Sequence, residues 1–408
     1  MKIAVIGGGA AGMFASAFAS TKQGVQVDLF EKNEKLGKKI YITGKGRCNF
    51  TNVCDVKTFC ENVVSNPKFV YGSLYKFTPN DVLNFFENNG LKYKVERGNR
   101  AFPLSDKASD VTKTLERVLN KNGVNIHLNT PVLSVEYQDN GVLLTTMSDI
   151  IHFDKVIIAT GGLSYPTTGS TGDGHKWAKK LGLNTIDCVA SLCELKTKQN
   201  FSSLAGISLK NVTLSAKLPK VKKQVELFGE MLFTHQGISG PIVLSMSAKV
   251  NRCHFPLDMN LDLKPALTDE QLNQRLLRDF SANSNKDIIN YLPELLPSGM
   301  CKTVAKVAKI EENKKIHQIT AVERQRLINA LKQFPITVTG LADIEQAIVT
   351  AGGIDVKEIN PATMQCKKFP NVYFAGEILD VDAMTGGFNL QIAFATGRLA
   401  GLSALETD

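Results

Sequence analysis

The chain has 408 residues, of which 43% are hydrophobic and 21% are charged. These proportions are typical of globular proteins, so they exclude a wholly disordered, fibrous or collagen-like chain, and the length indicates two or three domains. No segment approaches the roughly 18 unbroken apolar residues of a membrane helix. The 48 basic and 39 acidic residues leave a net charge of +9, which raises the question of nucleic acid or another anionic partner.

The eight cysteines form no CxxC pair, and no histidine follows them at metal-ligand spacing. This pattern disfavours a zinc ribbon or a thioredoxin-type motif, and we expect no metal site. Sparse, unpaired cysteines in a chain of this length fit a reducing compartment. We therefore expect a cytoplasmic protein that does not associate with a membrane.

The chain opens with the pattern of a dinucleotide-binding unit. Residues 2–6 (KIAVI) predict a short buried strand, residues 7–12 (GGGAAG) match GxGxxG, and residues 10–22 predict a helix. Residues 25–30 (VQVDLF) predict a second strand, and Glu31 follows it directly. This acid stands 19 residues after the last glycine of the motif, close to the spacing of about 20 in dinucleotide-binding units.

Each part of this unit has a physical task. Gly7 makes the tight turn, Gly9 lets the backbone approach a pyrophosphate, and Gly12 lets helix and strand pack closely. The helix start offers free N–H groups to phosphate. The Glu31 carboxylate can accept hydrogen bonds from a ribose and would repel a 2′-phosphate, so NADP is disfavoured here. A glycine turn without any ligand is the alternative, and the flanking strand, helix and acid disfavour it.

Three later segments favour FAD over NAD. Residues 32–52 form a basic, glycine-rich loop, which suits phosphate contacts but is also typical of a solvated loop. Residues 154–162 predict a strand that ends in Ala-Thr-Gly-Gly, with Thr160 and Gly161 at the turn. Residues 371–376 predict another strand, and a Gly-Gly pair then starts a last helix, whose N–H groups can stabilise charge on a reduced flavin. No second GxGxxG follows a strand between positions 160 and 350, so a dedicated NAD domain is not expected.

Five stretches together resemble the bacterial FAD flavoproteins of the BaiN-like or aminoacetone oxidase family. They are VIGGGAAG, GKKIYITGKGRCNFTN, IATGGLSYPTTGSTGDG, LFTHQGISGP and YFAGEILDVDAMTGGFNLQIAFATG, and their order and spacing cover most of the chain. One departure is Ala383, where many relatives have glycine. This difference leaves substrate inference at that loop open.

The resemblance implies a noncovalently bound FAD, with NAD(P)H as a transient reductant. It places the pyrophosphate at the glycine turn, the ribose at Glu31, the adenine at the backbone of Val132, and the ribityl chain and ring near the last strand and helix. Together with Thr160 and Gly161 from the strand turn, the expected cofactor residues are Gly7, Gly9, Ala11, Gly12, Glu31, Lys32, Lys38, Lys39, Gly44, Asn49, Val132, Gly376, Glu377, Asn389 and Leu390.

The middle of the chain predicts two inserted parts. Apolar and polar residues alternate before residue 264, whereas Thr268 with Gln271 and Thr320 with Glu323 have the spacing of helix capping boxes. The expected fold class is α/β: a Rossmann-type, glutathione-reductase-like FAD domain with a β-rich insertion and a helical subdomain. The expected boundaries are 1–188 and 352–408 for the FAD domain, 189–264 and 335–351 for the β-rich substrate domain, and 265–334 for the helical subdomain.

Two side chains are candidates for chemistry beyond cofactor binding. His235 is the candidate catalytic base, because imidazole is the side chain most used for proton transfer, although a histidine that only holds its turn is the simpler interpretation. Cys48 is a weaker candidate for a redox partner of the flavin, because no resolving thiol stands beside it in sequence.

The sequence therefore predicts an FAD-dependent oxidoreductase that transfers hydride between a small organic substrate and flavin N5. Oxygen, an enone or a nicotinamide cofactor is the expected redox partner. An RNA-modifying flavoprotein is one alternative, because residues 189–351 carry 21 basic and 15 acidic groups. Nucleic acid is disfavoured but kept open, since no aromatic-interleaved basic patch is visible. A non-catalytic flavin-binding protein is the other alternative, and the oligomeric state is not predicted.

Overall fold

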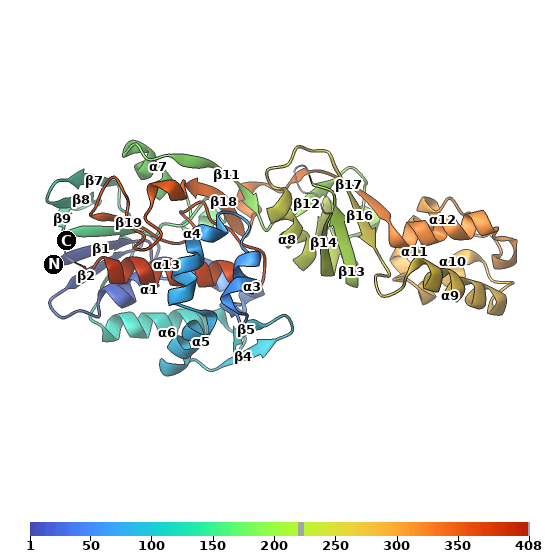
Figure 1. Cartoon of the computed structure of the whole chain (residues 1–408), viewed down its shortest axis with the longest axis horizontal. Coiled ribbons are helices and arrows are strands. Elements are labelled where there is room, and N and C mark those ends of the chain that lie inside the picture. Colours follow the sequence, from blue (N-terminus) through green and yellow to red (C-terminus); the bar gives the residue numbers. More distant parts are fainter. Residues whose placement is uncertain (219–223, 407–408) are drawn as a thin grey trace. The chain divides into compact units, whose positions relative to one another are not determined.

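A computed structural model describes residues 1–218 and 224–406 (Figure 1). Contacts divide the chain into two compact units. The first unit joins Met1–Ser191 with Asp343–Asp408, and the second unit is Leu192–Ala342. The first unit thus draws on both ends of the chain. The finer division expected from the sequence, with a separate helical subdomain, stays a prediction.

A parallel sheet of five strands lies at the centre of the first unit. Its order is β19-β10-β1-β2-β6, and Ile6 pairs with Phe30 on one side and Ile158 on the other. Strands β1, β2, β10 and β19 are mostly apolar and almost wholly buried, whereas the edge strand β6 is partly exposed. Such burial is typical of a parallel sheet covered on both faces. This sheet confirms the Rossmann-type fold class. Its strands are β1 (Lys2–Ile6), β2 (Gln26–Phe30), β6 (Asn125–His127), β10 (Lys155–Ile158) and β19 (Val372–Phe374).

Three smaller antiparallel sheets and a set of helices complete the first unit. The sheets contain β3 (Thr51–Asn52), β5 (Arg100–Pro103) and β4 (Tyr93–Glu96); β7 (Ser134–Gln138), β8 (Gly141–Thr145) and β9 (Ile150–Phe153); and β11 (Thr185–Ser191) with β18 (Val349–Ile354). The helices are α1 (Ala10–Ala19), α2 (Lys38–Ile42), α3 (Val56–Glu61), α4 (Pro67–Lys76), α5 (Pro79–Asn88), α6 (Ala108–Lys121), α7 (Asp173–Lys180) and α13 (Phe388–Ser403).

Helices α1 and α13 pack together at backbone contact (Figure 1). A Cβ atom on Gly397 of α13 would overlap the carbonyl oxygen of Ala11 on α1. Aromatic rings pack in the same interface. The ring centroids of Phe14 and Phe394 are 4.3 Å apart, and the ring centroids of Phe86 of α5 and Phe394 are 5.7 Å apart. The first helix of the glycine motif is therefore fixed by the last helix of the chain.

The second unit contains a closed β-barrel, which the sequence did not predict beyond its strand content. The barrel order is β12-β15-β14-β13-β16-β17. Its strands are β12 (Leu195–Thr197), β13 (Ser208–Ala216), β14 (Val225–Phe233), β15 (Gly237–Ser239), β16 (Leu257–Asp262) and β17 (Phe334–Leu341). The helices of this unit are α8 (Pro241–Val250), α9 (Asp269–Ala282), α10 (Ile288–Tyr291), α11 (Ser298–Val307) and α12 (Ala321–Lys332).

Both predicted capping boxes are confirmed. The Thr268 hydroxyl accepts the Gln271 N–H and starts α9, and the Thr320 hydroxyl accepts the Glu323 N–H and starts α12. In return, the side-chain oxygens of Gln271 and Glu323 accept the backbone N–H groups of Thr268 and Thr320. Each box thus satisfies two donors that a helix start would otherwise leave unpaired.

One predicted helix end was wrong by three residues. The first helix ends at Ala19 rather than near residue 22, and the hydroxyl of Ser20 bonds back to the carbonyl of Ser16 at 2.8 Å. Helix α8 begins after Gly240, which is its N-cap. Gly240 has φ +98°, and a Cβ there would lie 2.8 Å from Cα of Met231, so only glycine fits this cap.

Among the described residues, no helix combines the length and the apolar character that crossing a bilayer requires.

The contact between α1 and α13 gives a stability prediction. Gly397→Ala adds a methyl group against the Ala11 carbonyl, so we expect it to lower the free energy of unfolding by about 1–3 kcal/mol. Gly72→Ala in α4 adds the same group where nothing lies within 4 Å, and it should stabilise by about 0.5–1 kcal/mol because alanine favours helix. Urea unfolding followed by circular dichroism measures both, and equal stabilities for the two variants would contradict the close packing.

Candidate cofactor site

The glycine turn between β1 and α1 is shaped by two of its glycines. Gly7 has φ +105°, and a Cβ there would lie 2.5 Å from the Ala159 carbonyl oxygen after β10. A Cβ on Gly12 would overlap the carbonyl oxygen of Gly7 itself. These two positions therefore need glycine for the fold alone.

Gly9 differs from these two glycines. It caps α1 with φ −82°, an ordinary extended conformation, and no atom lies within 4 Å of a Cβ placed there. The start of α1 has no side-chain cap and no acidic residue in its first turn. The fold leaves open space and unsatisfied N–H groups at this helix start, as a phosphate ligand would require.

Glu31 closes the other side of the turn, at the end of β2. One carboxylate oxygen accepts the N–H of Gly8 at 2.8 Å. The other oxygen accepts the backbone N–H of Asn33 at 2.8 Å and its side-chain amide at 2.6 Å. Glu31 is only 8% exposed, so this carboxylate fixes the geometry of the glycine turn. Its contact with a ribose stays a prediction.

Lys39 and Glu377 form an ion pair that joins two of the sequence motifs. The Lys39 ammonium donates to both Glu377 oxygens at 2.8 Å and to the Ser164 hydroxyl at 2.6 Å. Glu377 also accepts the Thr350 N–H at 2.8 Å. Because these residues come from α2, β18 and the turns after β10 and β19, the network ties four distant segments to one point.

Three other basic side chains of this loop also pair with acids. Lys32 reaches Asp173 at 2.7 Å, Lys38 reaches Glu34 at 2.8 Å, and the Arg47 guanidinium pairs with Glu96 and Asp106. Partial burial disfavours the charge of Asp173, but hydrogen bonds from Lys32 and Thr171 outweigh it and lower the pKa of this carboxyl. The sequence predicted a basic loop, and the fold balances much of its charge with acids, one of them four residues away and the others far away in sequence.

Two polar atoms in this region lack a partner among the described residues. The side-chain oxygens of Asn49 and Thr160 are buried without a hydrogen bond. Thr160 follows β10, and its Cα lies 3.1 Å from a Cβ placed on Gly7. Asn49 Oδ1 lies 2.8 Å from a Cβ placed on Gly387. Since burying a polar atom without a partner costs about 1–3 kcal/mol, these atoms are suited to a bound polar molecule.

The C-terminal motif meets the glycine turn directly. Gly376 has φ +79°, and a Cβ there would lie 2.7 Å from the Cβ of Ala11. The Asn389 amide accepts the Ala383 N–H at 3.0 Å and donates to its carbonyl at 2.8 Å. The Asn389 side chain is thus occupied in holding the loop at Ala383, which is fully buried. Direct cofactor contacts of Asn389 and Leu390 stay predictions.

The remaining expected cofactor residues have fewer contacts with the glycine turn and the Lys39–Glu377 ion pair. Gly44 has φ +57°, and its Cβ position lies 3.1 Å from the Asn49 N–H nitrogen. Gly161 has φ +75° and packs beside Ser170. Val132 is 9% exposed between β6 and β7. The place of Val132 beside an adenine stays a prediction.

His235 lies in the loop between β14 and β15 of the second unit, and its side chain is exposed. Its role as a base stays a prediction. The sequence missed His175 of α7, which is 7% exposed and whose Nε2 lies 3.1 Å from the Ile378 carbonyl, next to Glu377. Burial lowers the pKa of His175, so it stays neutral and can donate to that carbonyl. Only its place in the TGDGH stretch could have indicated it.

Cys48 is completely buried, and burial raises the pKa of its thiol to about 12. At neutral pH it is therefore a thiol rather than a nucleophilic thiolate. This chemistry disfavours the redox role that the sequence left open for it. Within the described part of the chain, no group of three or more His, Cys, Asp or Glu side chains is arranged to hold a metal ion.

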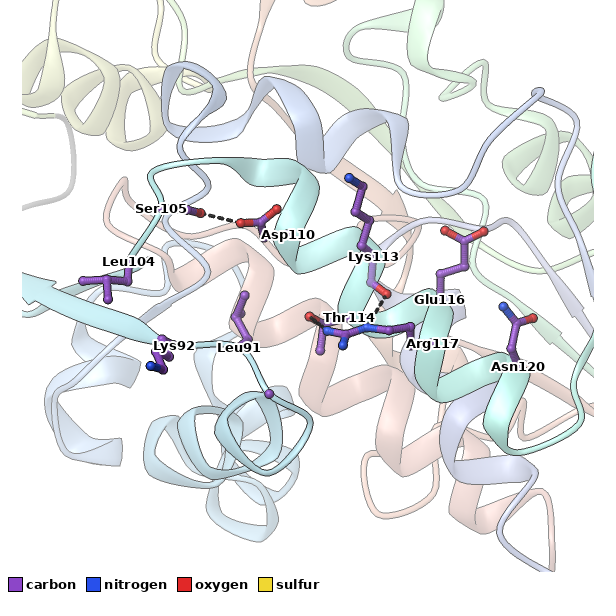
Figure 2. Close-up of a pocket in the computed structure, with 11 residues that line it drawn as sticks. Leu91, Lys92, Leu104, Ser105, Asp110, Lys113, Thr114, Glu116, Arg117 and Asn120 are labelled. Carbon is purple, nitrogen blue, oxygen red and sulfur yellow. Dashed lines mark hydrogen bonds between the residues drawn. The ribbon is translucent and has the colours of Figure 1, made fainter.

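A surface hollow of the first unit lies away from the expected cofactor residues. Its volume is about 720 Å³, and it is lined by α6 and by the segments around Leu91 and Leu104 (Figure 2). Inside it Ser105 bonds Asp110, and Arg117 bonds Thr114. None of the expected cofactor residues lines this hollow, so it is separate from the glycine turn.

Known proteins can now be compared with this arrangement. Residues 1–403 match the family described as the HI0933-like protein Rossmann domain. A 3-dehydro-bile acid delta(4,6)-reductase of Clostridium scindens is 30% identical, over 99% of both chains. A ribosomal RNA dihydrouridine synthase of Escherichia coli is 31% identical, over 96% of this chain and 95% of the relative.

Solved structures agree at the level of the fold. A 3-ketosteroid-delta4-(5alpha)-dehydrogenase from Rhodococcus jostii is 14% identical with a TM-score of 0.52, over 99% of this chain and 96% of the other. A 3-ketosteroid delta1-dehydrogenase from Sterolibacterium denitrificans is 13% identical with a TM-score of 0.53, over 99% of both chains. The family match confirms the resemblance that the sequence motifs carry. The chain belongs to the HI0933-like Rossmann family, and it is an FAD-dependent oxidoreductase.

Proposed function

We propose that the protein uses bound FAD to reduce a carbon–carbon double bond conjugated to a carbonyl group. The observation that carries the cofactor part is the open helix start at Gly9, where no atom lies within 4 Å of an added Cβ and no side chain caps the helix. When bound, FAD supplies hydride exchange at its N5 atom. The residues present fit this cofactor: the α1 N–H groups would hold its pyrophosphate, and Glu31 keeps the turn in shape.

The names of the relatives support the reaction class. A delta(4,6)-reductase of a 3-dehydro-bile acid acts on double bonds near a ketone, and a dihydrouridine synthase saturates the ring double bond of a uracil base. Both reactions add hydrogen across a double bond that a carbonyl polarises. The carbon of the double bond that is farther from the carbonyl would take a hydride from reduced FAD, and a proton drawn from solvent would complete the carbon beside the carbonyl. The hydride step needs mainly positioning and exclusion of water, so it requires no conspicuous catalytic side chain.

The Lys39 network has a defined part in this proposal. It balances the half-buried Glu377 carboxylate with an ammonium group at hydrogen-bond distance. A carboxylate left without this cation would disfavour negative charge on the reduced cofactor. We therefore assign Lys39 and Glu377 to positioning and charge balance. NAD(P)H remains the proposed reductant, bound only transiently.

Uridine in RNA is the second candidate substrate, and charge favours it. Residues 189–351 carry 21 basic and 15 acidic groups. Four lysines, at positions 217, 220, 222 and 223, stand in the connection between β13 and β14; the last three lie outside the described residues. Basic groups of this kind attract a phosphate backbone.

An anaerobic mixing experiment tests the reaction class. The FAD-loaded protein is reduced with NADPH or dithionite and mixed with a 3-oxo-4-ene steroid or with a uridine-rich RNA. We expect one of these to restore the visible absorbance of oxidised flavin at least tenfold faster than its saturated analogue does. If neither restores it and only oxygen does, the proposed reaction is wrong.

Gly9→Val separates folding from cofactor binding. The added side chain meets no protein atom within 4 Å at Cβ, so we expect unfolding within about 0.5 kcal/mol of the wild type. It would, however, occupy the phosphate space, and bound FAD should fall at least tenfold, as measured by flavin absorbance after gel filtration. Gly12→Val is the matched control, because its clash with the Gly7 carbonyl should lose folding and FAD together. Full FAD binding by Gly9→Val would contradict the assignment.

Lys39→Met tests the ion pair. The Lys39 and Glu377 side chains are only 20% and 21% exposed, so we expect a loss of about 1–3 kcal/mol in unfolding free energy. Lys39→Met combined with Glu377→Gln should recover part of it, because the carboxylate is then no longer uncompensated. Lys176→Met is the control, since Lys176 pairs with Asp173 at 3.3 Å while 73% exposed; it should change stability by less than about 0.5 kcal/mol. Additive losses in the double variant would rule out the coupling.

A further inference from the structure

Helix α4 carries two aromatic side chains on its outer face. Tyr71 and Tyr75 stand one turn apart and are 50% and 69% exposed. Their rings stack with centroids 6.2 Å apart and an interplanar angle of 19°. Large aromatic side chains are seldom exposed side by side where nothing binds them, because contact of their apolar rings with water is unfavourable.

The rest of this face is basic. The exposed residues of α4 are Lys68, Tyr71, Gly72, Tyr75 and Lys76, and the helix contains no acidic residue. Its opposite face packs into the core through apolar side chains and one serine: Phe69, Val70, Ser73 and Leu74. We call the five exposed residues the tyrosine face. It combines ring surface with positive charge and has no aliphatic side chain.

The start of α4 is bound to the segment that follows the C-terminal cofactor motif. Asn66, which caps α4, donates to the carbonyl of Asp380 at 2.7 Å and to its carboxylate at 2.9 Å. The N–H of Val64 donates to the Asp382 carbonyl at 2.8 Å, and Val63 bridges Ala383. The helix that carries the tyrosine face is thus anchored to the loop a few residues after Glu377.

We propose that the tyrosine face docks an unpaired segment of RNA. Bases would stack on the rings of Tyr71 and Tyr75, while Lys68 and Lys76 would contact phosphates on either side. Single-stranded RNA is bound in this way, by aromatic platforms set among basic groups. Lysine is depleted at protein–protein interfaces, whereas here an exposed lysine stands at each end of the face. This inference rests on the second candidate substrate of the proposed function.

This patch is not visible in the sequence because its residues have helical spacing. Tyr71 and Tyr75 are separated in sequence by Gly72 and the buried Ser73 and Leu74. The stretch therefore resembles an ordinary amphipathic helix with aromatic core residues. Only the fold shows that the tyrosines are on the outer side and the phenylalanine and leucine on the inner side.

Fluorescence anisotropy with a labelled oligouridylate tests the docking. The probe is titrated with the full FAD-loaded chain at low and moderate salt. We expect Tyr71→Ala with Tyr75→Ala to weaken binding roughly tenfold or more, as loss of base stacking does. Lys68→Gln with Lys76→Gln should flatten the salt dependence by about 1.4 in log–log slope, the loss of two phosphate contacts on a single strand. Phe228→Ala is the control, since Phe228 is an equally exposed aromatic residue (57%) in the second unit, and it should leave the affinity within about twofold.

The remaining outcomes are also decisive. Absence of RNA binding at low salt, or binding that the tyrosine variant leaves unchanged, overturns the proposal. So does self-association of the wild type that the tyrosine variant abolishes without any effect on RNA, because the face is then a protein interface. FAD content and thermal unfolding should be unchanged in both double variants, since the replaced side chains are exposed. This assay involves no redox step, so a negative result would not argue against reduction of an enone by the same protein. Likewise, a failure to reduce an enone would not argue against RNA docking.

Discussion

Backbone contact at helix α1 is the constraint on which the first unit depends. Gly12 lets the helix meet the Gly7 carbonyl at its start, and Gly397 lets α13 meet the Ala11 carbonyl on its side. Gly376 then brings the turn after β19 against Ala11. Because side chains are excluded at these points, the two ends of the chain meet at one helix start. The open position at Gly9 lies at that start, so the same packing that stabilises the unit also positions its candidate cofactor site.

Ion pairing is the second organising feature, and it shows that the net charge overstates the positive charge available to a ligand. Lys32, Lys38, Lys39 and Arg47 meet acids whose sequence distance ranges from four residues to over three hundred. Much of the positive charge near the glycine turn is therefore neutralised by the protein itself. The helix start, rather than a cluster of free lysines, remains as the group that would bind a pyrophosphate.

The sequence predicted local structure well where short-range physics decides it. The strand, glycine turn and helix of residues 2–19, and the capping boxes at Thr268 and Thr320, depend on neighbouring residues, and all of them are present. The barrel closure, the partners of Lys39 and the burial of His175 depend on contacts between distant segments. A single sequence holds no signal for such pairings, so these features could not be predicted. Among the expected site residues, the need for glycine could be predicted at two positions. These are Gly7 and Gly12, which were assigned to the tight turn and to close packing on steric grounds.

We propose above that FAD on this scaffold delivers hydrogen to a double bond conjugated to a carbonyl. Mass spectrometry of the organic substrate after one anaerobic turnover of reduced, FAD-loaded protein tests this proposal most directly. We expect one equivalent of saturated product per flavin, from an enone or from uridine in RNA. Recovery of every such substrate unchanged, with the flavin still reduced, would contradict it.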